Sequence, residues 1–399
     1  MALPSYNDAL AQALSVVHAL EDHEVVELAD SVGRILAQAI VADRHLPPYN
    51  RSQMDGYAVV ASEITNGVTM EVTARVSAGT NEAVELKPNT CVAIATGAPV
   101  PEQFDAVVQH ELTDRGDLAG GKVTFTVDEV KIGQAIHRRG SDATQGKELI
   151  CAGLKLSAQH IGIAATVGEI KVSVIRKPRV IVLTSGDEVV SPNVYPEPHQ
   201  IRNGNGPMLA SLFETFGCEI IHHQHVRDDP ESTTQAVNKA LQISDLLVTV
   251  GGISAGERDF FPEAFGSEDI AFVVQGAAIQ PGKPVMVGKK ADTMVLGLPG
   301  NPVSSLACAY LFGLPIVRAL LGVNTQMQWV ELPLARSVVP NRNRTAFRPC
   351  NLVDGKIEIP SWQGSGDLSH TSQTVGLAQL PMNDDEISAG ELVSFLRFE

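Results

Sequence analysis

The chain has 399 residues, more than one compact core usually holds, so two to four domains are expected. Hydrophobic residues make up 44% of it and charged residues 19%, a balance typical of globular proteins. The formal net charge of −16 argues against broad binding to nucleic acid or to anionic membranes, although it leaves small anionic ligands open.

Cysteine usage and the N-terminal region bear on the compartment. The five cysteines lie far apart and none forms a CxxC pair, which suits a reducing compartment and argues against a cysteine-ligated zinc site. No Lys or Arg precedes Arg34, so no signal peptide is expected. No uninterrupted apolar stretch reaches the length of a membrane span. These patterns predict a cytoplasmic protein without a membrane partner.

The predicted secondary structure of the first half of the chain changes twice, from helix to strands and back to helix. Residues 1–40 are predicted to be helical, because an apolar face is formed by Leu10, Leu14, Val17 and Leu20. Ser5-x-x-Asp8 resembles a capping box at the start of that helix. Residues 57–136 are rich in Val, Thr and Gly, which predicts an inserted β-rich domain. A short helix over 158–167 is expected to end at Gly168.

From Pro178 onward, strand and helix patterns alternate. The predicted strands cover 179–184, 218–226, 245–250, 272–274, 285–287 and 294–298. The predicted helices cover 206–216, 230–243 and 302–321. Such alternation indicates a doubly wound, mostly parallel sheet, and hence an α/β multidomain fold. Past Trp329 short strands and turns predict a small terminal β-domain.

The most informative segment is 246–260. An apolar run ends in Gly251-Gly252, and Gly256, Glu257 and Asp259 follow. The loop that leaves the carboxyl end of a parallel strand is where ligands bind in such sheets. Glycines let backbone N–H groups approach an anion, whereas a carboxylate there indicates a metal ion or a proton transfer. The alternative is an ordinary strand-to-helix turn.

Five further loops carry similar residues. They cover 46–59, 94–101, 183–189, 200–207, and 280–284 with 296–306. For 46–59 and 94–101 taken alone a plain turn is favoured, and helix capping is the alternative for 183–189 and 200–207. None is a Walker P-loop or has GxGxxG spacing. Taken together, Gly, carboxylate and amide groups at several strand ends of one sheet predict a ligand cleft.

The motifs occur in a characteristic order. They are PPYNRSQMDGYAV, ATGAPVP, TSGDEV, VGGISAGERDF, QPGKP and GLPGNPVSS. This set resembles the molybdopterin molybdenumtransferase family, usually called MoeA, to which the E domain of gephyrin belongs. The resemblance implies an elongated homodimer with four regions per chain. They are a helical region (1–45 plus 141–175), an inserted β-rich domain (46–140), a molybdopterin-binding α/β domain (176–326) and a C-terminal β-barrel (327–399).

The resemblance also implies an activity. Members of the family insert molybdate into adenylated molybdopterin and release AMP and molybdenum cofactor, with a divalent metal that is usually Mg²⁺. Their sites lie in a cleft between subunits. The expected partners are therefore a second copy of the chain, the two small-molecule substrates and possible other proteins of cofactor biosynthesis.

Individual residues take roles by the same resemblance. Catalytic positions match Asp55, Thr96, Asp142, Glu188, Asp228, Asp259 and Lys283. The metal is assigned to Glu188, Asp228 and Asp259. Positions that hold the pterin and its phosphates match Gly251, Gly252, Ser254, Gly300, Asn301, Pro302, Ser304, Arg348 and Ser369. Magnesium takes oxygen ligands and pairs with phosphate, which agrees with this assignment.

Three positions depart from the family pattern. The family has a lysine directly before its PGKP segment and another four residues earlier, where this chain has Gln280 and Gly276. A family arginine is replaced by His137. A cation beside an oxyanion contributes ~1–3 kcal/mol, so these losses weaken molybdate binding unless other cations compensate. Candidates to compensate are Lys283, Lys289 and Arg138.

The departures keep two alternatives open. One is a catalytically weak member that binds the pterin as a carrier or scaffold. The other is a paralogue that handles tungstate, which has the same charge as molybdate and nearly the same size.

Overall fold

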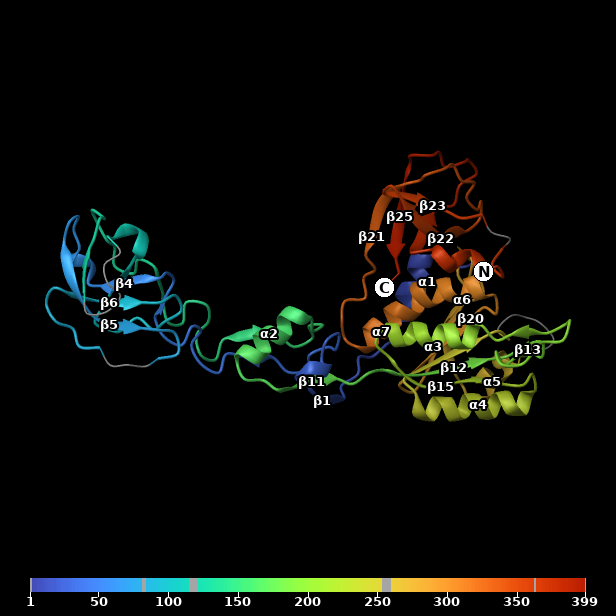
Figure 1. Ribbon diagram of the computed structural model, residues 1–399. Coiled ribbons are helices and arrows are strands. Elements are labelled where there is room, and N and C mark those ends of the chain that lie inside the picture. The colour runs from blue at the N-terminus through green and yellow to red at the C-terminus, as the bar shows by residue number, and fades with distance from the viewer. Residues whose placement is uncertain (1, 81–83, 115–120, 253–259, 362–363, 399) are drawn as a thin grey trace. The chain divides into compact units, whose positions relative to one another are not determined.

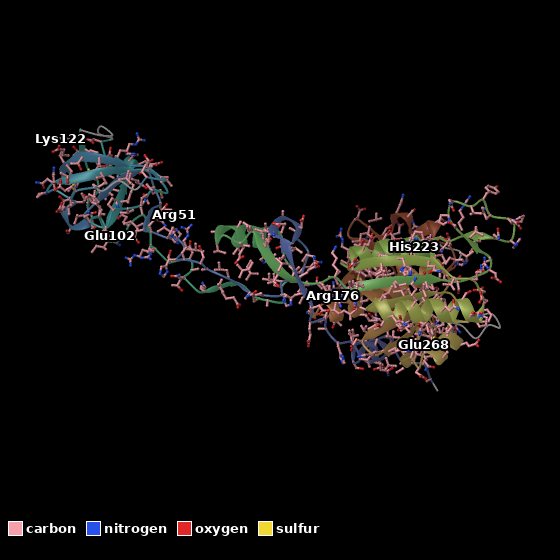
Figure 2. All side chains as sticks on the ribbon, turned by 90° about the horizontal axis from the view of Figure 1, so that it is seen from below. Arg51, Glu102, Lys122, Arg176, His223 and Glu268 are labelled. Carbon is pink, nitrogen blue, oxygen red and sulfur yellow. The ribbon has the colours of Figure 1, made fainter. Side chains whose placement is uncertain are left out.

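The computed structural model describes residues 2–80, 84–114, 121–252, 260–361 and 364–398 (Figure 1). The chain forms two compact units. Unit 1 consists of Met1–Glu24, Gly33–Ile35 and Val174–Glu399, and unit 2 of Val25–Val32 and Leu36–Ser173. His223 and Glu268 belong to unit 1 and Arg51 and Lys122 to unit 2 (Figure 2). The division into four regions stays a prediction.

The centre of unit 1 is a six-stranded sheet with the order β15-β12-β16-β20-β19-β17. The strands are β15 (Glu219–His225), β12 (Arg179–Thr184), β16 (Leu246–Val250), β20 (Thr293–Leu298), β19 (Met286–Lys290) and β17 (Ala271–Gln275). The first four are parallel, whereas β19 and β17 join antiparallel. The predicted mostly parallel α/β sheet is therefore confirmed.

Helices cover both faces of this sheet (Figure 1). They are α3 (Asn205–Thr215), α4 (Pro230–Ile243), α5 (Phe261–Ser267), α6 (Pro302–Cys308) and α7 (Leu314–Leu320). Successive residues of a strand point to opposite faces. Val180 and Val182 accordingly pack in one cluster with Phe213 of α3. Ile181 packs in another with Phe261 of α5. This two-sided burial explains why the strands read as continuous apolar runs.

One helical run of unit 1 is apolar along most of its length. Residues Pro302–Leu320, which include the π-helical turn Ala309–Gly313, span 19 residues and are long and apolar enough to cross a bilayer. Ser304, Ser305 and Arg318 interrupt the run, so the expectation that no uninterrupted apolar stretch reaches the length of a membrane span stands. Moreover, 83% of the apolar window of this run is buried inside the protein, where it packs on the main core of unit 1.

The N-terminal helix is shorter than the sequence predicts. α1 covers Tyr6–Leu14, capped by the Ser5 side chain, so the prediction of helix across residues 1–40 is wrong beyond Leu14. The β-branched pair in β1 (His23–Glu27) instead favours an extended strand that pairs with β11 (Lys171–Ile175). Tyr6 anchors α1 to unit 1, because its ring meets the ring of Phe347 edge-on at a centroid distance of 5.0 Å.

Unit 2 is built around a five-stranded sheet with the order β7-β4-β6-β5-β8. Its strands are β4 (Gly56–Val59), β5 (Thr69–Val76), β6 (Thr90–Ile94), β7 (Ala106–Gln109) and β8 (Lys122–Thr124). Alternating residues of β4 enter different clusters, Tyr57 on one face and Ala58 on the other. The helix α2 (Ala158–Thr166) begins at a capping box formed by Ser157 and His160.

A second sheet of unit 1 forms the C-terminal region. It consists of β18 (Ile279–Gln280), β21 (Trp329–Pro333), β22 (Thr345–Val353), β23 (Lys356–Glu358), β24 (Gly376–Leu380) and β25 (Leu392–Arg397). β21 and β23 lie at opposite edges, yet Leu334 pairs with Ile357 and the Ala335 amide donates to the Ile357 carbonyl at 2.8 Å. The sheet therefore curves towards closure, as the predicted terminal β-domain requires.

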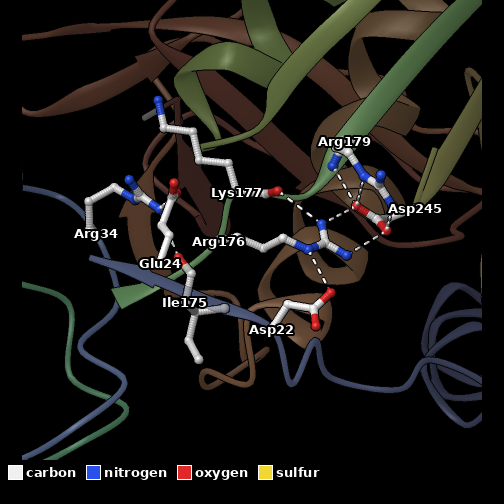
Figure 3. Close-up of polar contacts among 8 residues, drawn as sticks. All are labelled: Asp22, Glu24, Arg34, Ile175, Arg176, Lys177, Arg179 and Asp245. Atoms are coloured by element: carbon white, nitrogen blue, oxygen red, sulfur yellow. Dashed lines mark hydrogen bonds and ion pairs between the residues drawn. The ribbon is translucent and has the colours of Figure 1, made fainter. Parts of the chain in front are cut away.

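A buried carboxylate fixes the start of two neighbouring strands (Figure 3). Asp245, whose side chain is 10% exposed, accepts hydrogen bonds from both terminal nitrogens of Arg176, at 2.6 and 2.9 Å. It also accepts from the Arg179 amide at 2.7 Å. Burial by itself raises the pKa of Asp245, but the hydrogen bonds from Arg176 and Arg179 outweigh it and hold the pKa below its ordinary value.

We predict that Asp245→Asn lowers the free energy of unfolding of unit 1 by about 3 kcal/mol, since it removes the buried charge that Arg176 and Arg179 share. Arg176 keeps its ion pair with Asp22. Chemical denaturation followed by tryptophan fluorescence measures this, because both tryptophans of the sequence fall between Val174 and Glu399. Asp292→Asn, in the exposed turn between β19 and β20, is the control. Equal stability of the two variants would contradict the prediction.

The same carboxylate predicts a pH dependence. Because the folded pKa lies below the ordinary value of 3.8, the stabilisation is fully present above that value and is lost as the pH falls through the folded pKa. The stability difference between wild type and Asp245→Asn is therefore constant near neutral pH and shrinks only in strong acid. A difference that already shrinks between pH 7 and pH 5 would refute this assignment.

Candidate functional site

Three parallel strands of unit 1 end level with one another. Thr184 of β12 pairs with Val250 of β16, which pairs with Leu298 of β20. The next residue along each strand lines a cavity of about 860 Å³. That volume suits a ligand of drug or cofactor size. Further lining comes from the loops before α3 and α6 and from the 366–368 segment. The predicted cleft at the strand ends therefore exists within unit 1.

Glycines at the end of β16 bring the backbone to the cavity. Gly251 and Gly252 have φ of +81° and +57°, in the region that disfavours side chains. A Cβ on Gly252 would lie 2.9 Å from Ser185 Oγ and 3.1 Å from the ring of Phe261. The Gly251 amide donates to the Leu298 carbonyl at 3.1 Å. The glycine pair therefore allows two strand ends to approach each other beside the cavity.

Amide side chains organise the loops that open α3 and α6. Asn205 donates to the Gly300 carbonyl at 2.7 Å, and Asn301 donates to Ser365 Oγ at 2.9 Å. Gly300, Asn301 and Pro302 all line the cavity, as the cleft prediction requires. Ser304, predicted to be beside them, is instead 4% exposed and lies outside the lining residues.

Carboxylates also line the cavity. Asp228 accepts hydrogen bonds from the Gly186 and Asp187 amides, at 3.0 and 2.9 Å. Burial is the main cause that raises the pKa of Asp228, and the charges of Asp187 and Glu188 add to it, while the two amides oppose the shift. All three carboxylates line the cavity. Such a cluster of anions attracts a cation.

The described residues do not by themselves complete a metal centre. Across the described ranges, no three His, Cys, Asp or Glu side chains converge closely enough to hold an ion. Asp259, the third predicted metal ligand, and Ser254 lie outside the described residues. Glu188 and Asp228 both line the cavity and supply hard oxygen donors, so they fit a Mg²⁺ ion whose other ligands are water or phosphate.

A polar chain beneath the cavity was not foreseen from the sequence. Asn203 Nδ2 donates to Thr184 Oγ1 at 2.8 Å, and Thr184 Oγ1 lies 3.1 Å from Nδ1 of His225. Asn203 also accepts from the Gly206 amide at 2.9 Å, so it fixes the start of α3 as it lines the cavity. This chain of contacts could not be inferred from the sequence, because nothing in its spacing joins Thr184 to His225.

Three other predicted site residues of unit 1 lie away from this cavity. They are Lys283, Arg348 and Ser369. Lys283 lines a separate cavity of about 580 Å³ together with Arg344, although the adjacent Pro284 lines the first one. Arg348 lies in β22, where burial lowers the pKa of its guanidinium. Ser369 donates to Asp367 Oδ1 at 2.6 Å. None of the three predicted residues is among the described lining of the first cavity.

Gly276 and Gln280 replace two lysines of the family pattern, and the local structure explains both residues. Gly276 has a φ of +99°, and a Cβ there would lie 3.0 Å from Leu3 Cδ2 and 3.1 Å from the Lys283 carbonyl oxygen. A lysine at this position would therefore be strained. Gln280 accepts a hydrogen bond from Asn341 Nδ2 at 2.8 Å, so its side chain is held by a neutral partner.

The remaining predicted residues form a second cluster, in unit 2. The Thr96 amide donates to Asp55 Oδ1 at 2.8 Å. Asp142 Oδ1 lies 2.8 Å from Nε2 of His137, the third departure. β3 (Arg51–Ser52) links these pairs, because Ser52 accepts from the Gly97 amide and Arg51 pairs with His137. The structure thus brings Asp55, Thr96 and Asp142 to one edge of unit 2.

We predict that Gly252→Ala lowers the free energy of unfolding by ~1–2 kcal/mol, because an L side chain in the left-handed region is strained and this one also meets Ser185. Gly366→Ala is the matched control, since Gly366 lines the same cavity and its Cβ would lie 3.9 Å from the nearest atom. Denaturant titration of both variants checks this. Equal stability of Gly252→Ala and Gly366→Ala would contradict the close approach of Gly252 to Ser185.

Comparison with known proteins agrees with this architecture. Family models match residues 4–168 (MoeA N-terminal region, domain I and II), 181–319 (probable molybdopterin binding domain) and 331–398 (MoeA C-terminal region, domain IV). A molybdopterin molybdenumtransferase from Nostoc is 30% identical over 99% of this chain and 94% of its own length. One from Synechococcus elongatus is 32% identical over 97% of each chain.

A solved structure gives the same result. A molybdopterin biosynthesis moea protein from Pyrococcus horikosii has a TM-score of 0.85 and 29% identity, with both chains covered in full. The resemblance found in the sequence motifs is confirmed by matches over nearly the whole length. The chain belongs to the MoeA family.

Proposed function

We propose that the protein is a molybdopterin molybdenumtransferase, which inserts molybdate into adenylated molybdopterin and releases AMP. The observation that carries the proposal is the cavity at the level ends of β12, β16 and β20, which is lined by both glycines and carboxylates. The relatives' names support this reaction over a carrier role or tungstate handling. We further propose that the enzyme acts as a cytoplasmic homodimer.

Different lining residues suit different parts of the substrate. Gly251, Gly252 and Gly300 line the cavity without side chains, and we assign their backbone to the pterin and its phosphates. Among the described lining residues, Arg202 is the only cation, and its Nε is held by the Val194 carbonyl at 3.1 Å. A guanidinium fixed at the cavity is suited to bind phosphate oxygens. We assign it to the adenylate.

The carboxylates suit a divalent cation. We propose that Glu188 and Asp228 hold Mg²⁺, with Asp259 as the third ligand by resemblance. When bound, Mg²⁺ would neutralise phosphate charge and so favour cleavage of the adenylate. The chain itself contributes orientation, because the Gly186 and Asp187 amides fix both oxygens of Asp228. Asp55, Thr96, Asp142 and Lys283 are proposed to act in the same reaction.

We expect Mg²⁺-dependent AMP release when the protein is incubated with adenylated molybdopterin and molybdate. Asp228→Asn should raise the Mg²⁺ concentration for half-maximal rate by at least about tenfold, since it removes a charge and turns an amide nitrogen towards a backbone N–H. Asp229→Asn is the matched control, because Asp229 only caps α4 and Asn caps as well as Asp.

The outcomes are separable. Absence of AMP release above background by the wild type would refute the proposed reaction. Release that is unaffected by chelation of Mg²⁺, or equal Mg²⁺ dependence of the two variants, would refute the metal assignment but leave the reaction.

A further inference from the structure

Three polar side chains of unit 2 form a continuous chain outside the cavity already described. Arg51 of β3 lies directly opposite His137 of β9 (Ile136–His137) in the antiparallel register. Arg51 Nη2 is 3.0 Å from His137 Nδ1, and His137 Nε2 is 2.8 Å from Asp142 Oδ1. Directly opposite residues of an antiparallel pair interact through their side chains, so the register places Arg51 against this ring.

The order of partners determines where the imidazole carries its proton. A guanidinium has N–H donors and no acceptor, so His137 Nδ1 must accept from Arg51. Asp142 Oδ1, as a carboxylate oxygen, accepts, so Nε2 must carry the hydrogen. Both contacts are satisfied together only by the neutral imidazole with hydrogen on Nε2. A proton on Nδ1 would face a donor.

Asp142 is held from three directions. Its amide donates to the Leu46 carbonyl at 2.9 Å, and its carbonyl accepts from Lys147 Nζ at 3.3 Å. His137 fixes the carboxylate itself. Among the described residues, no other side chain donates to this carboxylate, and Asp142 is 55% exposed. Its second oxygen, Oδ2, is therefore presented to solvent in a set orientation.

We propose that His137 is a positioning residue: as a neutral Nε2–H imidazole, oriented by Arg51, it aims Asp142 Oδ2 at the substrate. The inference deepens the proposed function, because it takes Asp142 to act in that reaction. In this role the imidazole donates a hydrogen bond to Asp142 and holds its carboxylate in place. It transfers no proton to the substrate.

The first test does not depend on activity. Long-range ¹H–¹⁵N correlation spectra of the full chain distinguish a protonated from an unprotonated ring nitrogen, and the signals of His137 are those that vanish in His137→Phe. At pH 8 we expect Nε2 protonated and Nδ1 unprotonated. A proton on Nδ1, either as the other tautomer or as an imidazolium, would overturn the proposal. If His137→Phe folds poorly, His137→Gln, which keeps an acceptor for Arg51 and a donor for Asp142, supplies the same assignment.

The second test measures turnover. His137→Phe should lower kcat for AMP release by at least about tenfold, because a misplaced group costs rate, with KM for adenylated molybdopterin within about twofold. His137→Gln should restore most of kcat, since an amide can accept from Arg51 and donate to Asp142. His223→Phe, the same change at an exposed position of β15 (Figure 2), is the control.

The outcomes again differ. An unchanged kcat in His137→Phe, or a kcat for His137→Gln as low as that of His137→Phe, would overturn the positioning role. If the wild type releases no AMP, the proposed function fails, while the spectrum still decides the arrangement of Arg51, His137 and Asp142.

Discussion

The parallel register between β12 and β16 is the constraint on which the candidate cavity depends. At the amino ends, Asp245 directly before β16 binds the Arg179 amide at the start of β12, which brings the two strand starts together. Because parallel strands advance equally per residue, Thr184 and Val250 then end level. A slip by one residue would turn every side chain to the other face. The register therefore sets both the core and the cavity.

Glycine geometry and carboxylate placement follow from that register. The Gly251-Gly252 turn can pass Ser185 only because the two strands end at the same level, and neither residue leaves space for a Cβ. Asp228 comes from the loop after β15, on the other side of β12, and reaches the Gly186 and Asp187 amides just beyond the end of β12. Three neighbouring strand ends therefore share one cavity, and each supplies a different chemistry.

Much of this could be predicted from the sequence, and the failures have physical causes. The apolar runs of β12, β16 and β20 were predictable because strands covered on both faces contain few polar residues. The helix across residues 1–40 was wrong because its apolar spacing carried past Leu14 into the strand-forming Val25-Val26 pair. The pairings of Thr184 with His225 and of Arg51 with His137 depend on strand register, which composition and spacing do not encode.

The charge balance of the cavity limits which ligands it can bind. Its described lining contains Asp187, Glu188 and Asp228 against Arg202 alone, inside a chain whose net charge is −16. Coulomb repulsion in a partly buried site would exclude a phosphate-bearing anion unless a cation enters with it. If Glu188 and Asp228 hold Mg²⁺, as proposed, the metal and the anionic substrate would each make binding of the other more favourable. The family lysines that Gly276 and Gln280 replace are expected to affect the binding of molybdate more than the joint binding of Mg²⁺ and substrate. Neither position is among the described lining of the cavity.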